Sequence, residues 1–170
     1  MSKSFVSINI CLITISDTRK KENDKSGNLL QKRIVNFGHH VSERIIIKDE
    51  FNIIRKKIND FSLNPKIDTI ITTGGTGLTG RDSTPEAVNS LSSKNIEGFG
   101  ELFRQLSFDK IGTSTIQSRA LAAVINHTYV FSLPGSPGAC KDAWDEILKY
   151  QLDIRHKPCN FIEIMPRLKE

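Results

Sequence analysis

The sequence is poor in the residues that build disulfide frameworks and zinc sites. Its 170 residues include three cysteines, which form no Cys-x-x-Cys pair, and four histidines, none of them spaced four residues apart. No stretch approaches the roughly 20 consecutive apolar residues that span a bilayer. These absences exclude a disulfide scaffold, a cysteine–histidine zinc site and a membrane helix. The unpaired cysteines favour a reducing, cytoplasmic location.

The charge of the chain is positive but diffuse. Lysine and arginine number 24 against 19 aspartate and glutamate, which gives a net charge of +5 and an isoelectric point near 9.2. The longest basic cluster, residues 19–21, is followed by Glu22 and Asp24. This pattern suits small anionic partners and lacks the concentrated basic patch of a nucleic-acid-binding protein. We expect residues 1–170 to form a single globular domain.

The N-terminal half alternates between strand-like runs and helical stripes. Segments of strand length occur at residues 7–16, 41–47 and 69–73. The first of them is apolar on both sides of the pleat, as in a parallel sheet covered on both faces. Helical periodicity follows the first two runs, and Ser26 or Gly27 is expected to open the first helix. Such alternation predicts right-handed crossovers and a doubly wound sheet.

The C-terminal half predicts one reversal of strand direction. Helices are expected at residues 98–107 and 115–119, and strands at 121–125 and 129–133. The three residues between these two strands are enough for a hairpin, so one strand should run antiparallel. A closing helix should begin at Ser136 and present an inward stripe formed by Cys140, Trp144, Ile147 and Leu148. The predicted fold class is α/β, with helices on both faces of a mostly parallel sheet.

A glycine-rich loop follows the predicted strand at 69–73. Residues 74–80 contain four glycines at the edge of the sheet where open α/β proteins bind ligands. Glycine adopts positive φ and lets backbone N–H groups approach an oxyanion, which suits a phosphate. A dinucleotide-binding fingerprint does not fit, because its helix should begin at once, whereas residues 81–83 separate this loop from a helix cap at Thr84. A P-loop does not fit either, because Arg81 and Asp82 stand where its lysine and its serine or threonine belong. The alternative is that the glycines only form a tight turn.

Two carboxylates also follow predicted strands. Asp49 and Asp82 each lie just past a strand, and oxygen ligands of this kind suit Mg²⁺ bound together with substrate phosphates. Alternatively, Asp49 is a helix N-cap and Asp82 a loop-capping residue. The spacing alone leaves both interpretations open.

The segment Thr-Thr-Gly-Gly-Thr-Gly-Leu-Thr-Gly-Arg-Asp-Ser-Thr-Pro-Glu-Ala at residues 72–87 resembles the MoaB/MogA family of molybdenum cofactor biosynthesis proteins, in particular its MoaB branch. Further similar blocks occur in the expected order at 98–104, 116–119 and 133–139. The resemblance implies a three-layer α/β/α domain that assembles into homotrimers or homohexamers. It places the pterin site at the edge carrying the glycine loop.

The same resemblance implies particular roles for individual residues. It assigns Asp49 and Asp82 to catalysis and to binding Mg²⁺. The substrate-binding positions that it implies are Ser16, Asp17, Thr73, Gly74, Gly75, Thr76, Gly77, Ser118, Arg119, Pro134, Gly135 and Ser136.

The expected activity is adenylylation of molybdopterin with Mg-ATP. The partners are then a small-molecule pterin and a nucleotide, with no nucleic acid and no membrane. The alternative is a non-catalytic molybdopterin-binding or assembly subunit of the same pathway. The loop carries Glu86 where MogA-type loops usually have aspartate, and a binding-only protein would keep the same phosphate loop.

Overall fold

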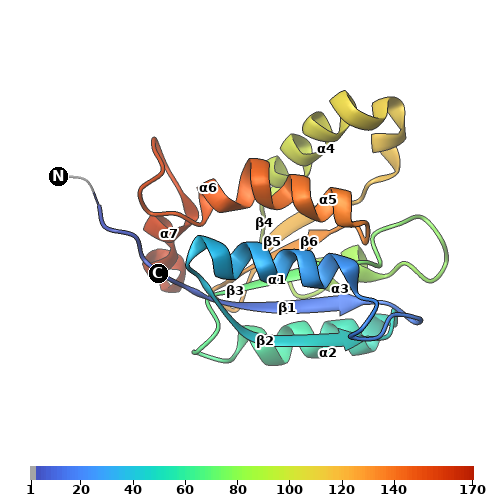
Figure 1. Cartoon of the computed structure of the whole chain (residues 1–170). Helices are drawn as coiled ribbons and strands as arrows, with labels where there is room; N and C mark the ends of the chain where they lie inside the picture. The colour runs from blue at the N-terminus through green and yellow to red at the C-terminus, as the bar shows by residue number, and fades with distance from the viewer. Residues whose placement is uncertain (1–2) are drawn as a thin grey trace.

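The computed structural model describes residues 3–170, and over this range the strands form one six-stranded sheet in the order β2-β1-β3-β6-β5-β4 (Figure 1). Strands β2, β1, β3 and β6 are parallel neighbours, whereas β5 runs antiparallel to both β6 and β4. The predicted antiparallel strand is therefore confirmed. The strands are β1 (Asn9–Ile15), β2 (His40–Ile47), β3 (Thr69–Thr73), β4 (Lys94–Asn95), β5 (Leu121–Ile125) and β6 (Thr128–Leu133).

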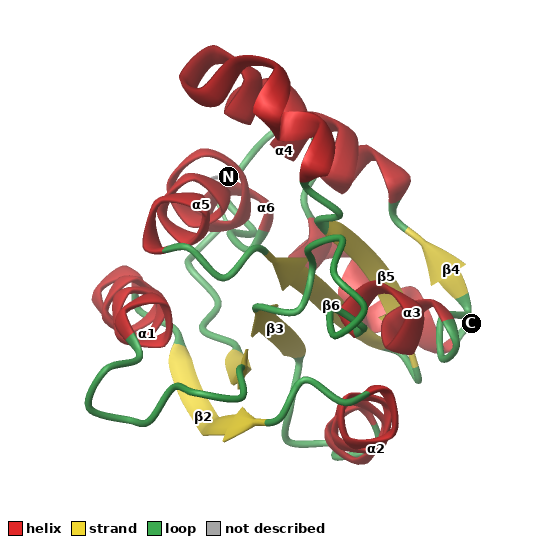
Figure 2. Ribbon diagram, turned by 90° about the vertical axis from the view of Figure 1, so that its right-hand side faces the viewer, coloured by secondary structure: helices red, strands yellow, loops and turns green. Residues whose placement is uncertain are grey.

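Helices cover both faces of the sheet and complete the predicted three layers (Figure 2). The helices α1, α4 and α5 lie on one face and α2 and α3 on the other. No helix within residues 3–170 is long and apolar enough to cross a membrane. The helical segments are α1 (Lys25–Phe37), α2 (Phe51–Ser62), α3 (Thr84–Asn89), α4 (Glu97–Ile111), the 3-10 helix η1 (Gly112–Gln117), α5 (Pro137–Asp142), the π-helical turn η2 (Ala143–Leu148), α6 (Lys149–Gln151), α7 (Phe161–Ile164) and η3 (Met165–Lys169).

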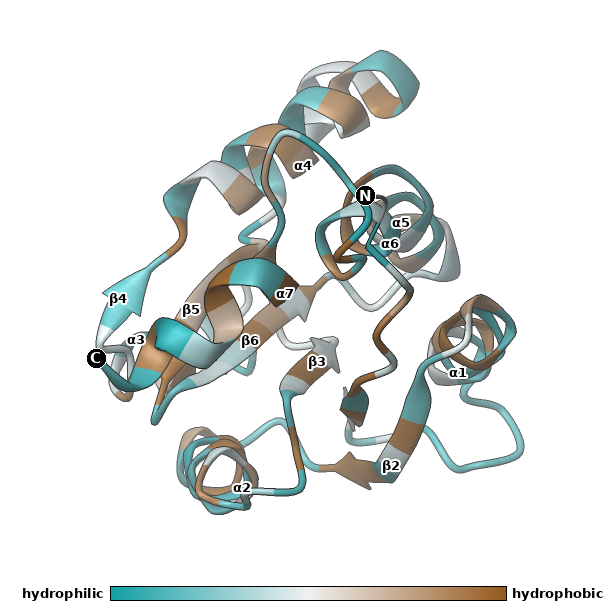
Figure 3. Cartoon of the chain, turned by 90° about the vertical axis from the view of Figure 1, so that its left-hand side faces the viewer, coloured by the Kyte–Doolittle hydropathy of each residue, from teal (hydrophilic) through white to brown (hydrophobic). Residues whose placement is uncertain are grey.

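Strand β1 supplies both hydrophobic cores because successive side chains of a strand point to opposite faces. Ile10 and Leu12 pack in the cluster beneath α1, α4 and α5, whereas Cys11 and Ile13 pack in the cluster beneath α2 and α3. Figure 3 shows hydrophobic residues along β5 and part of β2, whereas the short strand β4 is hydrophilic. The expected inward stripe of the closing helix is confirmed, since Cys140, Trp144, Ile147 and Leu148 are all buried.

Some element boundaries differ from those predicted. Neither Ser26 nor Gly27 opens α1, because Asp24 is the N-cap and accepts a hydrogen bond from the Gly27 N–H at 3.0 Å. Residues 115–119 do not form a helix of their own, since a 3-10 helix runs directly on from α4 over Gly112–Gln117. The two-residue strand β4 is exposed and has no apolar alternation that would predict it.

Candidate functional site

The ends of four parallel strands place the predicted site residues along one edge of the sheet. The strands are in register there, with Ile15 beside Ile47, Thr14 beside Thr73, and Thr73 beside Leu133. The loops that follow β1, β2, β3 and β6 therefore meet at the right-hand edge of the molecule in Figure 1. This edge carries Ser16, Asp17, Asp49, the glycine loop, Asp82 and the Pro134–Gly135–Ser136 turn.

The glycine loop is packed tightly against β1 and α3. Gly74 has a φ of +105°, and a Cβ at this position would lie 2.2 Å from the carbonyl oxygen of Ile15. Gly75 has a φ of +64°, and its Cβ would lie 2.3 Å from Thr84 Oγ1. The Thr84 hydroxyl donates to the Gly74 carbonyl at 3.0 Å, so it fastens the loop instead of capping α3. The N–H groups of Gly75 and Thr76 donate to no group in the described part of the chain, which leaves them available to an anion.

Asp49 reaches from the end of β2 to the far end of the glycine loop. Its Oδ1 accepts hydrogen bonds from the Ser83 N–H at 3.2 Å and the Ser83 hydroxyl at 3.1 Å. The N-cap interpretation of Asp49 is wrong, because Glu50 occupies that position of α2. Burial raises the pKa of Asp49, and the neighbouring carboxylates Asp82 and Asp17 raise it further against the two bonds from Ser83.

Asp82 stabilises the tip of the loop in which it lies. Its Oδ2 accepts hydrogen bonds from the Thr79 N–H at 2.8 Å and the Thr79 hydroxyl at 2.6 Å, which confirms the loop-capping interpretation. Partial burial opposes ionisation, but hydrogen bonds from Thr79 and from the backbone of Gly77 outweigh it and lower the pKa of Asp82. Asp82 is therefore the more acidic of the two predicted magnesium ligands.

The two carboxylates fit Mg²⁺ by their chemistry, although they make no multi-ligand cage. Within residues 3–170, no group of three or more His, Cys, Asp or Glu side chains is arranged to hold a metal ion. Mg²⁺ commonly takes only one or two carboxylates and completes its shell with substrate phosphates and waters. Asp49 Oδ2 accepts no hydrogen bond from the described residues, so it has a lone pair to offer. The magnesium role of Asp49 and Asp82 stays a prediction.

Ser16 and Asp17, which follow β1, stabilise their own loop and contact the loop that follows β2. Asp17 Oδ1 accepts a hydrogen bond from the Asp49 N–H at 3.2 Å, and Asp17 Oδ2 forms an ion pair with Arg81 at 2.7 Å. The Ser16 hydroxyl accepts hydrogen bonds from the N–H groups of Thr18 and Arg19 and closes the turn. Asp17 thus links three of the loops at this edge.

A cleft of 460 Å³ lies between the glycine loop, the turn after β6 and helix α4. Nine of the predicted residues line it, namely Gly74, Gly75, Thr76, Gly77, Asp82, Ser118, Pro134, Gly135 and Ser136. The opposite wall comes from α4 and η1 and was missed at the sequence level. It consists of Phe103, Ser107, Ile111 and Gln117. Their spacing in the sequence did not distinguish them from core residues, and only the structure shows that Ile111 is 55% exposed at the end of its helix.

Thr73 lies behind the cleft and not in its lining. Its side chain is buried and its hydroxyl donates to the Pro134 carbonyl at 3.0 Å. The same hydroxyl lies 3.1 Å from the Cys140 sulfur, whose pKa burial raises to about 11. Thr73 therefore joins the end of β3 to the turn after β6.

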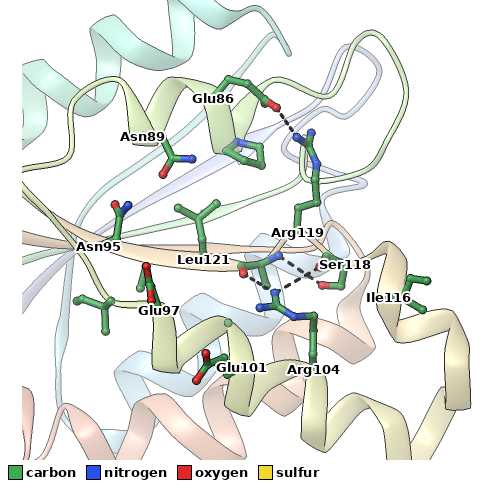
Figure 4. Close-up of a pocket in the computed structure, with 15 residues that line it drawn as sticks. Glu86, Asn89, Asn95, Glu97, Glu101, Arg104, Ile116, Ser118, Arg119 and Leu121 are labelled. Carbon is green, nitrogen blue, oxygen red and sulfur yellow. Dashed lines mark hydrogen bonds and ion pairs between the residues drawn. The ribbon is translucent and has the colours of Figure 1, made fainter.

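Arg119 holds the glycine loop from the side opposite to β1. Its Nε donates to the Gly77 carbonyl at 2.8 Å, its Nη2 donates to the Asp82 carbonyl at 3.1 Å, and its Nη1 pairs with Glu86. Figure 4 shows Arg119 on the wall of a neighbouring 620 Å³ pocket, with Arg104 bonded to the carbonyls of Ser118 and Ala120 below it. The guanidinium of Arg119 is occupied by the protein itself.

The fold and this edge together define the chain as a doubly wound α/β protein of the class that binds a small ligand beside the carboxyl ends of its strands. Residues 11–154 match the sequence family described as a probable molybdopterin binding domain. The chain therefore belongs to the MoaB/MogA family of molybdenum cofactor biosynthesis proteins.

Relatives match over nearly the whole chain. Molybdenum cofactor biosynthesis protein B of Escherichia coli K12 is 44% identical over 170 residues, which cover 100% of this chain and 98% of that protein. A crystal structure of a molybdenum cofactor biosynthesis protein B superimposes with a TM-score of 0.88 at 37% identity and covers 98% of this chain and 99% of its own. The tungsten cofactor synthesizing protein MoaB from Pyrococcus furiosus gives a TM-score of 0.78 at 30% identity, with 96% and 98% covered.

Proposed function

We propose that the protein binds molybdopterin at the glycine-loop cleft and adenylylates it with ATP and Mg²⁺. Family membership supports a role in molybdenum cofactor biosynthesis and a pterin ligand. The observation that carries the finer proposal is the contact between Asp49 and the glycine loop, which brings a carboxylate to backbone N–H groups that have no protein partner. Phosphoryl transfer needs this combination of anion cradle and metal-binding oxygens.

In the proposed reaction, a terminal phosphate oxygen of molybdopterin attacks the α-phosphorus of ATP. A phosphorus–oxygen bond forms, the bond to the β-phosphate breaks, and pyrophosphate leaves. Since the nucleophile is already ionised at neutral pH, the protein mainly has to position two anions. Asp49 and Asp82 would hold Mg²⁺, which when bound would neutralise charge on the phosphates.

The remaining side chains act on geometry in this proposal. Gly75 and Thr76 offer N–H groups to the phosphate, and Ser118 and Ser136 line the cleft as hydroxyl donors. Arg119 and Asp17 contact the loops and keep them in place, and Thr73 supports the turn from behind.

The protein is further proposed to work as a cytoplasmic homotrimer or homohexamer in which residues 1–170 form one domain. Four large apolar side chains of α4 and η1 are more than 40% exposed and could be covered by other subunits. They are Leu102, Phe108, Ile111 and Ile116.

A second candidate function is a non-catalytic molybdopterin-binding or assembly subunit. It is favoured by the contacts of Asp82 and Arg119, whose side chains are already engaged in holding the loop. In that case the carboxylates serve loop structure, and the cleft binds the pterin without chemistry.

Product formation separates the two candidates. Purified protein is supplied with molybdopterin, ATP and Mg²⁺, and adenylyl-molybdopterin and pyrophosphate are measured. We expect product from the wild type and a sharp loss in Asp49→Asn and Asp82→Asn. Asp60→Asn is the control, because Asp60 pairs with Lys56 on the outside of α2. Pterin binding without product would favour the binding subunit, and full turnover by both site variants would remove these carboxylates from the mechanism.

A further inference from the structure

Arg19 connects two loops that are separated by 116 residues in the chain. It follows β1, and its Nη2 donates to the Gly135 carbonyl at 2.7 Å, in the turn after β6. Its Nη1 donates to the Ser26 hydroxyl, which in turn donates to the same carbonyl at 3.1 Å. Because β3 lies between β1 and β6 in the sheet, Arg19 spans the end of the strand that carries the glycine loop.

The buried carboxylate of Asp24 forms an ion pair with Arg19. Asp24 is fully buried, and its Oδ1 lies 3.8 Å from Arg19 Nη1. The Asp24 carboxylate also accepts hydrogen bonds from Thr14, Gly27 and Arg44, so its charge is fixed in place. Asp24 therefore faces two arginines, of which Arg44 is the closer at 2.9 Å. Because Arg44 is the closer partner of Asp24, the Nη2 group of Arg19 is available to donate to the Gly135 carbonyl.

The Gly135 carbonyl controls the direction of the next peptide N–H. In a trans peptide the carbonyl and the following N–H point in opposite directions. A carbonyl bound to Arg19 thus directs the Ser136 N–H away from Arg19, and this N–H donates to no other group in residues 3–170. Gly135 also lies against the glycine loop, since its Cβ position is 3.4 Å from Gly74 Cα.

We propose that Arg19 is a positioning residue for the cleft: it fixes the Gly135–Ser136 peptide against Gly74 so that the Ser136 N–H adds to the anion-binding groups of the glycine loop. The inference rests on the proposed binding of molybdopterin at this cleft. Its structural part, the restraint of the turn by Arg19, needs no ligand and is tested separately.

The first test is hydrogen–deuterium exchange on the unliganded protein. Arg19→Gln is compared with Arg33→Gln. The Arg33 side chain is 26% exposed, against 28% for Arg19, and it also pairs with an aspartate, Asp145, but between α1 and η2 and not at the glycine-loop edge. We expect about tenfold faster amide exchange at residues 134–139 and 74–77 in Arg19→Gln, as for the loss of one charge-assisted hydrogen bond. Equal exchange of these segments in both variants would overturn the proposal.

The second test is titration of molybdopterin into the same variants, followed by steady-state kinetics with ATP and Mg²⁺. We expect Arg19→Gln to weaken molybdopterin binding and raise its KM by about tenfold with a smaller change in kcat. Arg19→Lys should recover part of the affinity, because an ammonium can reach Gly135 or Ser26 but lacks the fork that serves both. Unchanged affinity in Arg19→Gln would overturn the proposal. If the wild type binds molybdopterin but forms no product, adenylylation fails as the function, whereas the affinities still test Arg19.

Discussion

The Cβ position of Gly75 lies 2.8 Å from Oδ2 of Asp49. The glycine loop and the carboxylate after β2 can therefore approach each other only because residue 75 has no side chain. The φ of +64° at Gly75 adds a second reason, since L-residues rarely adopt it. This contact places the free oxygen of Asp49 beside the unpartnered N–H groups of the loop.

Gly75→Ala should push Asp49 and Thr84 away from the loop. We expect it to weaken molybdopterin binding and to destabilise the protein by about 1–3 kcal/mol, from overpacking and backbone strain together. The control is Gly80→Ala, because a Cβ at residue 80 meets nothing within 4 Å. Isothermal calorimetry and thermal unfolding measure both effects. Identical affinity and Tm for the two variants would contradict the importance of this contact.

Asp49→Asn should stabilise the fold while it removes a proposed metal ligand. Because the pKa of Asp49 is raised in the folded protein, its protonated form is favoured there, and ionisation near neutral pH opposes folding. An asparagine can still accept the bonds from Ser83 without the charge. We expect Tm at pH 7 to rise, by about 2–4 °C for each kcal/mol gained, with less gain at pH 3. A lower Tm at pH 7 would show that the ionised carboxylate is stabilising.

His39 should make the protein sensitive to mild acid. It is 2% exposed among Phe5, Phe37 and Trp144, and burial lowers its pKa to about 4. Its Nδ1 accepts a hydrogen bond from the Ile8 N–H, which protonation would break. The stability that the neutral ring provides is complete above pH 6.5 and is lost as the pH falls from there through about 4.

The measurement is Tm as a function of pH for His39→Phe, with the exposed neighbour substituted in His40→Phe as the control. We expect His39→Phe to lose less Tm than the wild type between pH 6.5 and 4, and His40→Phe to follow the wild type. Parallel curves for all three proteins would assign the acid sensitivity to other groups.

The three thiols should react with alkylating agents at very different rates. Burial raises the pKa of Cys11 to about 12 and that of Cys140 to about 11, whereas Cys159 is exposed. We expect iodoacetamide at pH 8 to label Cys159 alone in the native protein and all three cysteines after unfolding. Mass spectrometry of digested protein identifies the labelled sites. Rapid native labelling of Cys140 would mean that the turn after β6 opens frequently.

The sequence predicts the frame of this protein better than its cleft. Strand β3 is predicted residue for residue because all five side chains of Thr69–Thr73 are β-branched and turn-forming residues bound the segment. The position of Asp49 and Asp82 at one edge follows from the parallel order of the strands. In contrast, the bond from Arg19 to Gly135 joins distant parts of the chain through side-chain reach, which no local periodicity encodes.

The wall formed by α4 and η1 was missed for a related reason. Phe103 is spaced as an ordinary core residue of α4, and nothing in the pattern distinguishes packing against the sheet from lining a cleft. The sequence pattern around Asp24 is that of a polar loop. Its carboxylate can be fully buried because Thr14 and Arg44, from two different strands, donate hydrogen bonds to it. Such features depend on how the elements dock, and hydrophobic patterning fixes only which faces turn inward.

The position of β6 also bears on how the molecule is made. This strand is the last in the chain, yet it lies between β3 and β5 inside the sheet. On the ribosome, a nascent chain that has released its first three strands still exposes the open edge of β3, a site for misassociation, until β6 is inserted. Since the Pro134–Gly135–Ser136 turn follows β6, the cleft is completed only at that step. With the proposed ligand site at this cleft, we expect ligand binding to require a finished fold, so that partly synthesised chains do not compete for the ligand.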